Sequence, residues 1–283
     1  MNLRRTLLLL AAFFITLAGY AQKDNHPIGA RSVALGNASV TLSDFWSCHN
    51  NQAGLAFYNQ MAVGIYGENR FLIKELTQGA FGFVMPVKKA GVFAVNYNYY
   101  GFKLYNESKV GLAYAMMLGD RISAGVQLDY LRVAQAENYG NANIFTFEFG
   151  LRARIIKELV FGVHVYNPIH AKVSKYGTDR VPVILRAGLS YTFSDKAVVA
   201  IETEKDINQK AQFRAGVEYH LVKPVYIRLG LGTNPFNNSF GIGLEFGNFQ
   251  ADISASRHQI LGFSPQISLM YSFRKWKRMD SQE

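Results

Sequence analysis

The sequence contains few of the features that stabilise small exported proteins or anchor helical membrane proteins. Cys48 is its one cysteine, so no disulfide can form within the chain, and stability in an oxidising compartment must come from elsewhere. One long apolar run extends from Leu7 to Leu17, and no later run approaches the roughly 18 residues of a membrane-spanning helix. These absences exclude a disulfide-stabilised scaffold and a protein built from several membrane-spanning helices.

Motifs of enzymes and metal sites are absent as well. The sequence has no G-x-S-x-G, H-E-x-x-H or C-x-x-C. The glycine-rich stretch GLGTNPFNNSFGIG joins two predicted strands and lacks the helix N-terminus that a phosphate site needs. The six histidines do not have the spacing of metal ligands: His26, His49, His164, His170, His220 and His258. We therefore predict a protein without enzymatic activity, metal or cofactor.

The first residues have the pattern of a secretion signal. The stretch MNLRRTLLLLAAFFITLAGYAQ begins with Arg4 and Arg5, continues with the apolar run and ends in small residues before Gln22. A retained membrane anchor is the alternative, but the run is short and its small residues suit a signal peptidase. We predict that residues 1–21 are a signal peptide and that the protein is exported.

From about residue 61 onward, apolar and polar residues alternate. In VFAVNYNYY, Phe93 and Val95 fall on one face of an extended chain, and Ala94 and Asn96 on the other. About fourteen such segments follow one another, starting near Ala62, Gln78, Val92, Lys109, Ile122, Ile144, Leu159, Ile184, Val198, Gln212, Val225, Phe240, Phe249 and Gln266. An even number of long strands, 14% aromatic residues and a mean hydropathy of +0.01 are typical of an outer-membrane barrel. We predict an all-β fold, an antiparallel up-and-down transmembrane β-barrel of about fourteen strands over residues 61–273, in the cell outer membrane.

The connections between these segments alternate in length. The short ones are VKKAG, LGDR, IIKE, FSDK, LVKP and FGNF, and longer ones such as ENRFLIKEL, YGFKLYNES and YNPIHAKVSKYGTDRVP stand between them. Outer-membrane barrels have tight periplasmic turns and longer outer loops. The pattern therefore predicts that the short connections face the periplasm.

Charged residues gather on the polar face of the predicted strands. A charge that faces lipid near the middle of the membrane costs about 2–4 kcal/mol, so this face must line the lumen. The lumen-lining charges are Lys109, Asp129, Glu148, Arg152, Arg154, Arg186, Glu202, Arg214, Glu218, Arg228, Glu245 and Asp252. Because both signs occur, two interpretations remain open: a network of ion pairs, or a track for an ionic or amphipathic ligand.

Glycine recurs on the same face of the strands. It occurs at Gly111, Gly125, Gly150, Gly162, Gly188, Gly216, Gly230 and Gly243. Within a strand, glycine marks a bend or the close approach of another backbone. About fourteen strands also enclose a space that needs a plug or becomes a pore. Either the wall is sharply curved at these glycines, or another segment occupies the lumen.

The last predicted strand, PQISLMYSF, carries Tyr271 and Phe273 on its outer face. A terminal aromatic strand resembles the signal that is read by the barrel-assembly machinery of the outer membrane. Residues 274–283 follow, and their four basic side chains predict a solvated periplasmic tail, with a partner protein or lipid phosphates as alternative contacts.

The charge balance is basic, with a formal net charge of +10. Such a balance is also found in nucleic-acid-binding proteins. The predicted export signal and the lack of a basic stripe with interleaved aromatic residues argue against nucleic acid. We expect the basic residues to be attracted to outer-membrane lipid, including lipopolysaccharide.

Residues 22–60 precede the first predicted strand and contain the stretch GARSVALGNASVTLSDFWSCHNNQAGLAF. This stretch resembles the N-terminal signature of the FadL-like outer-membrane barrels, especially the PorV and PorQ branch of Bacteroidota. The matching residues are Gly29, Ala30, Arg31, Ala34, Leu35, Gly36, Ala38, Asp44, Asn51, Ala53, Gly54, Leu55 and Ala56. Gln52 stands where the family has proline, so the chain departs from the pattern at the turn that follows Asn51.

The resemblance implies a fourteen-stranded barrel whose N-terminal segment forms a hatch, or plug, in the periplasmic mouth. Its small residues would let the backbone lie close to the wall glycines, and Arg31 and Asp44 could pair with lumenal charges. The resemblance to PorV and PorQ further implies an accessory or adaptor role in type IX-like protein secretion, with secretion proteins or secreted cargo as partners. The alternative is a FadL-like channel for hydrophobic small molecules that is gated by the hatch, which predicts an apolar pocket near the outer end of the lumen. A purely structural barrel is the third hypothesis.

Overall fold

The computed structural model describes residues 25–136, 141–173, 180–194 and 196–273. The predicted signal peptide (1–21) and basic tail (274–283) lie outside the described residues. Within the described ranges, no helix has both the length and the apolar character needed to cross a bilayer.

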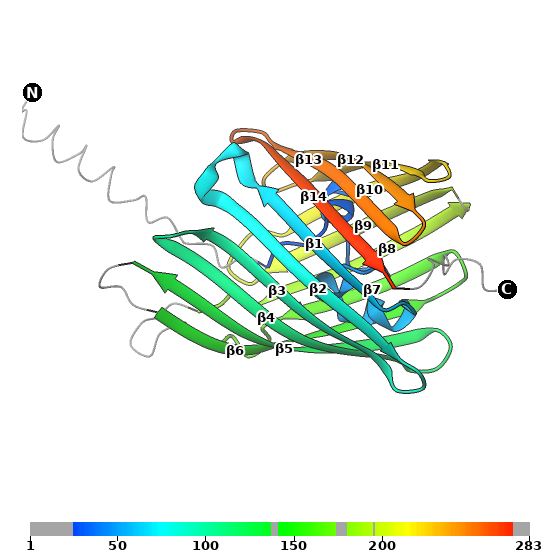
Figure 1. The fold of residues 1–283 in the computed structure, drawn as a ribbon, viewed down its shortest axis with the longest axis horizontal. Coiled ribbons are helices and arrows are strands. Elements are labelled where there is room, and N and C mark those ends of the chain that lie inside the picture. The colour runs from blue at the N-terminus through cyan, green and yellow to red at the C-terminus, as the bar shows by residue number, and fades with distance from the viewer. Residues whose placement is uncertain (1–24, 137–140, 174–179, 195, 274–283) are drawn as a thin grey trace, which may run out of the picture.

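Fourteen antiparallel strands form one closed barrel (Figure 1). The strands are β1 (Ala62–Asn69), β2 (Thr77–Val87), β3 (Gly91–Phe102), β4 (Tyr105–Met117), β5 (Ile122–Gln135), β6 (Asn141–Arg154), β7 (Leu159–Tyr166), β8 (Ile184–Ser194), β9 (Ala197–Asp206), β10 (Gln212–Val222), β11 (Val225–Gly232), β12 (Asn237–Phe246), β13 (Phe249–His258) and β14 (Gly262–Ser272). Each strand pairs with its neighbours in the chain, and β1 closes the barrel against β14 with Ala62 opposite Ser272. The predicted fold, a closed up-and-down barrel of fourteen strands, is confirmed. We call the end at which β14 stops the inner end, and the opposite end the outer end.

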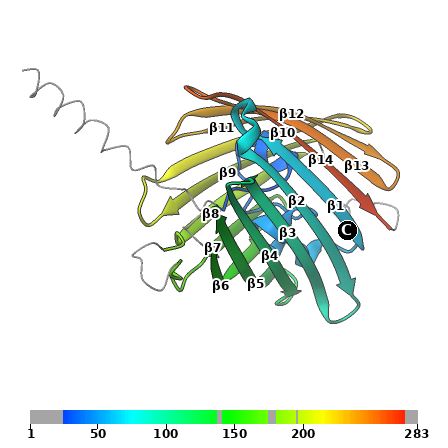
Figure 2. The same ribbon diagram turned by 60° about the vertical axis from the view of Figure 1, so that its left-hand side comes forward.

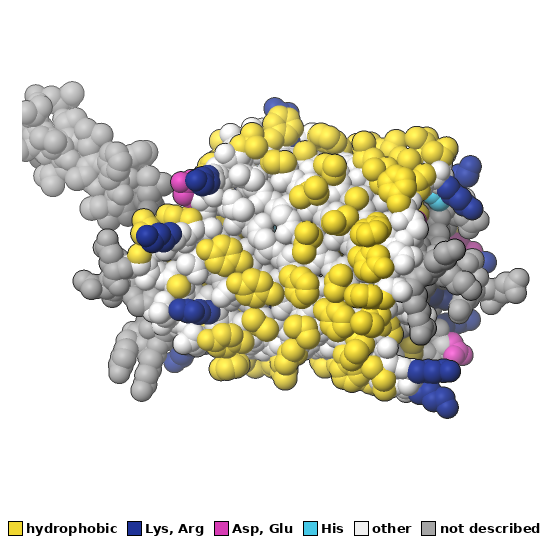
Figure 3. Space-filling model, in the orientation of Figure 1, with side chains coloured by type: hydrophobic (Ala, Val, Ile, Leu, Met, Phe, Trp, Pro, Cys, Tyr) yellow, Lys and Arg dark blue, Asp and Glu magenta, His cyan; other side chains and the backbone are white. Residues whose placement is uncertain are grey.

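The alternation of residues accounts for the two faces of the wall. On β3, Ala94 and Asn96 are buried inside the barrel, while Phe93, Val95 and Tyr97 are exposed on its outside. Figure 3 shows the resulting surface: hydrophobic side chains cover much of the wall, and Lys and Arg lie toward the two ends. The aromatic and branched residues that would form a core in a soluble protein therefore face outward here.

The predicted alternation of connection length does not hold throughout. Between β3 and β4 only residues 103–104 lie outside the strands, and Phe102 pairs with Tyr105 across the hairpin. The polar stretch Asn106 to Ser108, predicted as part of a longer loop, continues β4. Pairing with β3 extends the strand because Gly101, with a φ of +108°, adopts a conformation that lets the chain turn sharply. The connection after β7, residues 167–183, remains long, and the first outer connection contains two short 3-10 helices, η2 (Arg70–Leu72) and η3 (Lys74–Leu76).

The segment before β1 lies inside the barrel. It contains α2 (Ala30–Ala34), α3 (Ser47–Asn50) and the 3-10 helix η1 (Gln52–Phe57), and nearly all of residues 25–60 are buried. In Figures 1 and 2 this segment is the blue chain enclosed by the strands. We call residues 25–60 the plug.

The resemblance implies a hatch in the periplasmic mouth, but the plug extends along much of the length of the barrel. Its first residue, Asn25, accepts a hydrogen bond from Lys109 (3.0 Å) and also contacts Arg186, and both partners lie in the outer parts of their strands. Toward its other end, the Ala53 carbonyl accepts from Ser123 (2.8 Å), near the inner end of β5. The plug reaches this far because its small residues fit closely against the wall.

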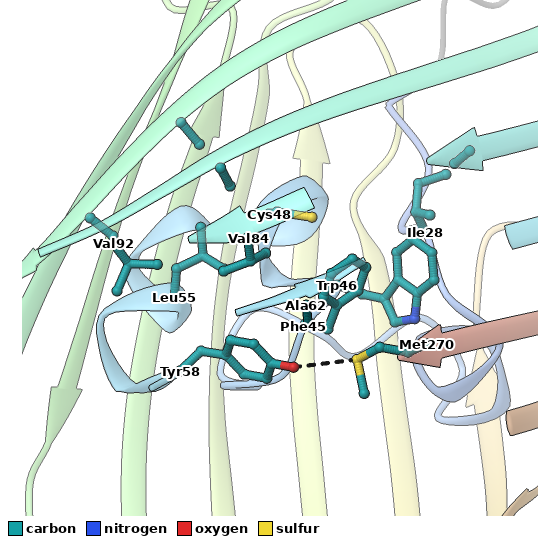
Figure 4. Close-up of a cluster of buried hydrophobic side chains, with 14 of the residues drawn as sticks. Ile28, Phe45, Trp46, Cys48, Leu55, Tyr58, Ala62, Val84, Val92 and Met270 are labelled. Carbon is teal, nitrogen blue, oxygen red and sulfur yellow. Dashed lines mark hydrogen bonds between the residues drawn. The ribbon is translucent and has the colours of Figure 1, made fainter. Parts of the chain in front are cut away.

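An apolar cluster fixes the plug where it joins the wall (Figure 4). Phe45, Trp46 and Leu55 of the plug pack with Val84 and Met270 of the wall. The rings of Phe45 and Trp46 meet edge to face at 4.9 Å, an arrangement that favours aromatic pairs. The Tyr58 hydroxyl lies 3.5 Å from the Met270 sulfur. The larger apolar cluster is thus the contact between plug and barrel, and a smaller one around Ile144 lies toward the outer end.

Candidate functional site

The plug backbone lies directly against wall glycines. A Cβ added at Gly216 would meet the Leu35 carbonyl oxygen at 2.5 Å, and one added at Gly230 would overlap the backbone nitrogen of Gly36. Gly36 itself has a φ of +66°, which favours glycine, and its N–H donates to Ser239 (3.1 Å). Close approach of two backbones therefore explains why glycine is needed on both sides of this contact.

The same explanation holds for other glycines of the lumen face. Cβ atoms at Gly125 and Gly150 would collide with the plug between Asn51 and Ala53, and one at Gly162 would lie 2.5 Å from the Val40 carbonyl. At Gly111 and Gly243 the neighbours are lumenal side chains instead. Of the two interpretations of this pattern, occupation of the lumen by another segment accounts for most of the glycines.

Arg31 of the plug belongs to a chain of ion pairs that crosses from plug to wall. Its guanidinium binds Asp44 (3.1 Å) and Glu218 (2.7 Å). Glu218 also binds Arg228 (2.6 Å), and Arg228 binds Asp252 (2.6 Å). Burial acts to lower the pKa of Arg31, but Glu218 and Asp44 outweigh it and hold that pKa above its usual value. Each buried charge is thus matched by its neighbours.

A second group of ion pairs holds the middle of the plug. Glu202 accepts hydrogen bonds from the backbone N–H groups of Ser39 and Val40, both at 2.7 Å. Arg214 bridges Glu202 (3.2 Å) to Glu204 (2.7 Å). Arg186 binds Glu204 at 2.6 Å and reaches the Asn25 carbonyl. The carboxylate of Glu202 thereby satisfies plug backbone groups that would otherwise be buried without partners.

A third group, which we call the Glu148 cluster, consists of Gln52, Lys109, Glu148 and His164. Glu148 lies 2.8 Å from Lys109, 2.9 Å from His164 and 2.9 Å from the Gln52 amide nitrogen. Lys109 also donates to Asn25 (3.0 Å), so the cluster is bonded to the plug at two distant points. Gln127 and Asp129 extend it along β5.

The turn at Asn51 is well defined although proline is absent after it. The Asn51 side chain accepts from the Ala53 N–H (3.2 Å) at the start of η1 and donates to the Val40 carbonyl (2.6 Å). A Cβ added at Gly54 would lie 2.4 Å from the Leu42 carbonyl oxygen, so the backbone at Gly54 packs closely against Leu42. Gln52 therefore replaces proline with an amide that binds Glu148.

The remaining residues predicted for the site occupy different depths. Gly29, Ala30, Ala53 and Leu55 are within the plug, and Gly29 packs against Trp46. Arg152 is buried, donates to the Thr41 carbonyl (2.9 Å) and lies 4.3 Å from the Phe57 ring centroid. Arg154 is half-buried, 5.3 Å from the same ring.

Glu245, Tyr271 of β14 and Phe273, which follows β14 directly, also lie near the inner end. Glu245 is half-buried, and its backbone N–H donates to the Pro224 carbonyl (3.0 Å). Tyr271 packs against Phe249 and Phe273, with ring centroids 4.8 and 5.3 Å away.

Two titratable plug residues have altered pKa values. Burial, together with the charge of Lys109, lowers the pKa of His49 to about 3, and its Nε2 lies 3.3 Å from the Phe81 carbonyl. Burial raises the pKa of the Cys48 thiol, which therefore stays protonated. Among the described residues, no group of three or more His, Cys, Asp or Glu side chains could hold a metal ion.

A small cavity lies above the plug at the outer end. It is lined by polar residues, among them Arg70, Lys109 and Arg132, and by the less polar residues Leu131, Val133, Ile144, Tyr166 and Val181. Its volume of about 50 Å³ is far below the roughly 300–1,000 Å³ of small-molecule sites, so a ligand of ordinary size does not fit in it.

Asn167 holds the long connection after β7 over this cavity. Its side-chain oxygen accepts from Thr146 (2.7 Å) and from the Ala171 N–H (3.1 Å), and its nitrogen donates to the Val181 carbonyl (2.8 Å). Val181 in turn packs on Ile144 inside the barrel. The described part of the connection is therefore folded inward over the plug.

Several members of this site were not singled out in the sequence. Glu204 shares the parity of Glu202 along β9, and Gln127 and Asn96 share the parity of other buried residues, so alternation could have identified them. Asn167 lies in a connection, so no local pattern indicates its role. Gln52 stands out in the sequence only as a departure from the family pattern, and nothing local predicts its bond to Glu148 on β6.

The fold was compared with known proteins. No model of a protein family matches the chain, and no curated protein matches it. Among solved structures, the CymD monoaromatic hydrocarbon channel has a TM-score of 0.70 and 13% identity over 89% of this chain and 99% of that one. The toluene transporter TodX of P. putida has a TM-score of 0.64 and 12% identity over 89% and 100% of the two chains. A Pseudomonas aeruginosa FadL homologue has a TM-score of 0.64 and 10% identity over 87% and 98%. The chain therefore shares the fold of these barrels over nearly its whole length.

Proposed function

We propose that this protein is a non-enzymatic barrel of the outer membrane, exported by means of residues 1–21. The exposed outer wall supports this location, because it carries apolar side chains such as Phe147, Leu128 and Ile253 on strand after strand. Soluble monomers rarely expose contiguous apolar patches larger than a few hundred Å². Lipid is the solvent in which such a wall is stable.

Within the membrane, the barrel acts as a gated channel for hydrophobic small molecules. The observation that carries this function is a large closed barrel whose lumen is filled by a separate, polar-anchored segment of the same chain. Two of the barrels with the same fold are described as a monoaromatic hydrocarbon channel and a toluene transporter. Because the cavity above the plug holds only about 50 Å³, passage requires the plug to shift.

A disulfide between plug and wall tests this function with a single substitution. The Cys48 sulfur lies 3.2 Å from the position of a Cβ at Gly82, close to the roughly 3 Å between a sulfur and the far Cβ of a disulfide. The other neighbours of that Cβ are atoms at the far edge of the Phe45 ring, at 2.9 and 3.1 Å, so the ring must shift slightly in any variant with a side chain at position 82. In Gly82→Cys we expect the oxidised protein to lose uptake of labelled toluene by cells and to regain it after treatment with a reductant.

Gly82→Ser is the matched control, since it adds a side chain of similar size that cannot form the bond. Its uptake should equal that of the unmodified protein with and without reductant. Equal uptake by oxidised Gly82→Cys and Gly82→Ser would contradict a channel that opens by movement of the plug.

Two partners follow from the outer-membrane location. Tyr271 and Phe273 at the end of the last strand support recognition by the barrel-assembly machinery. Exposed basic residues at the outer end, including Lys74 and Lys103, suit the phosphates of lipopolysaccharide.

An accessory role in protein secretion, as in PorV and PorQ, is the second candidate. The observation that favours it is the closed lumen, since an adaptor needs no pore and would meet secretion proteins or cargo at its rim. Pull-down from outer membranes in mild detergent separates the two functions. Recovery of secretion components, with toluene uptake unchanged when the protein is deleted, would replace the channel function with this one.

A further inference from the structure

The inner rim of the barrel is basic. Five of the six inner turns carry exposed Lys or Arg side chains, namely Lys88, Lys89, Arg121, Lys157, Lys196 and Lys223. These turns connect neighbouring strands around the barrel, so the charges encircle the inner mouth. Asp120 and Glu158 are the acidic residues described in these turns, so the six cations leave the inner rim with a net positive charge.

One part of this rim is a notch between two adjacent turns. Asp120, Arg121, Arg154, Ile156 and Lys157 line it. The turns are joined by a hydrogen bond from the Arg154 N–H to the Arg121 carbonyl (2.7 Å). Three cations and one carboxylate therefore share the notch.

The two arginines are neighbours across the β5–β6 pair, where Ile122 lies opposite Ala153. Like charges on directly neighbouring strands are destabilising. The Arg154 guanidinium lies 5.3 Å from the Phe57 ring, a contact that orients the side chain without neutralising it. With Asp120 as its one carboxylate, the notch keeps an excess of positive charge that an anion can balance.

Exposed apolar side chains lie in the same turns. Leu118 and Ile122 flank Arg121, and Ile155 and Ile156 precede Lys157; all four are exposed. A soluble acidic protein that met the mouth along the barrel axis would leave these groups in water. A lipid satisfies both features, because its phosphate can reach the cations while its acyl chains cover the isoleucines and leucine.

We propose that this notch binds an anionic phospholipid of the inner leaflet, with Arg121 and Lys157 as its main phosphate contacts. The inference rests on the proposed membrane location but not on channel activity. The bound lipid fixes the depth of the barrel on its periplasmic side and balances the excess positive charge of the notch.

Titration of the purified full-length protein with phosphatidylglycerol, followed by native mass spectrometry, tests the proposal. We expect Arg121→Gln/Lys157→Gln to bind this lipid about 25-fold more weakly, because each lost cation should weaken binding about fivefold. Lys74→Gln/Lys103→Gln, which removes the same charge from the outer end, should bind as the unmodified protein does. Phosphatidylglycerol should also raise the melting temperature of the unmodified protein and not that of the inner-rim variant.

Several results would overturn the proposal. Equal weakening in both double variants would mean attraction to net charge, and equal binding of phosphatidylcholine would remove the role of the headgroup charge. Displacement of the lipid by millimolar inorganic phosphate would indicate a simple anion site.

Flotation of the protein with liposomes is measured separately, and its failure would contradict the membrane location itself. Retained heat-modifiable migration on gels shows that each variant is folded.

Discussion

At the scale of single residues, the contact between Gly36 and Gly230 decides whether the plug fits. A Cβ at Gly230 would overlap the plug backbone at Gly36. The end of a flexible side chain could move aside, but backbone cannot. We expect Gly230→Ala to leave the barrel folded but to displace the plug, so that ion conductance appears in planar bilayers. The unmodified protein should stay closed under the same conditions.

Gly67→Ala is the control for this substitution. A Cβ at Gly67 meets only the Ile267 side chain at 3.8 Å, an ordinary van der Waals distance. The variant should remain closed and as stable as the unmodified protein. Conductance that is equal in the two alanine variants would show that plug seating does not depend on glycine at position 230.

His49 makes the stability of the plugged barrel sensitive to acid. Its pKa of about 3 lies below the roughly 6.5 of an unfolded histidine, so above pH 6.5 it is neutral in both states and has no effect. As the pH falls below 6.5, the unfolded chain takes up the proton first, and stability is lost progressively toward pH 3. Between pH 6.5 and pH 5 this loss amounts to about 2 kcal/mol.

His49→Gln should remove that part of the pH dependence. A glutamine amide can donate to the Phe81 carbonyl, as the His49 Nε2 does, but it does not titrate. Urea unfolding in detergent at pH 7 and pH 5 measures the difference, and the lumenal carboxylates contribute equally to both proteins. An identical loss of stability in the two proteins would contradict a buried neutral His49.

At the scale of elements, the connection after β7 depends on Asn167. This residue is buried and has a φ of +50°, which asparagine tolerates better than most residues. Asn167→Ala removes its four side-chain hydrogen bonds, at about 1–3 kcal/mol for each group left without a partner. We expect the connection to leave the outer mouth and toluene uptake to become faster.

Asn208→Ala is a suitable comparison, because Asn208 is exposed in another outer connection and uses its backbone N–H to bind Asp206. It should change neither uptake nor melting temperature. If Asn167→Ala lowers the melting temperature while uptake stays the same, the connection stabilises the fold without limiting access.

Elements that follow local alternation could be predicted from the sequence. The fourteen strands and the inward parity of residues such as Asn96 depend on neighbouring positions within one strand. The hairpin at residues 103–104 could not be predicted in this way. Asn106 to Ser108 have the polar character of a loop, and only their pairing with β3 shows that they belong to a strand.

At the scale of the whole molecule, most of the contacts that define the site join residues far apart in the chain. The sequence predicts that Arg31 and Asp44 meet lumenal charges, but the identity of the partner, Glu218, depends on how ten strands and the plug are placed together. The same holds for Gln52 and Glu148. Charge and parity can be predicted locally, whereas pairing requires the closed barrel.

The plug seated against wall glycines also has a consequence for how this sequence can change over generations. Gly36 with Gly230, Gln52 with Glu148 and Arg31 with Glu218 each form a pair in which one member limits the choice of the other. A single substitution in either partner leaves a collision or an unmatched buried charge. Among descendants of this chain, substitutions in the plug and in the inner wall should therefore occur together, while the exposed outer face of the wall varies freely among apolar residues.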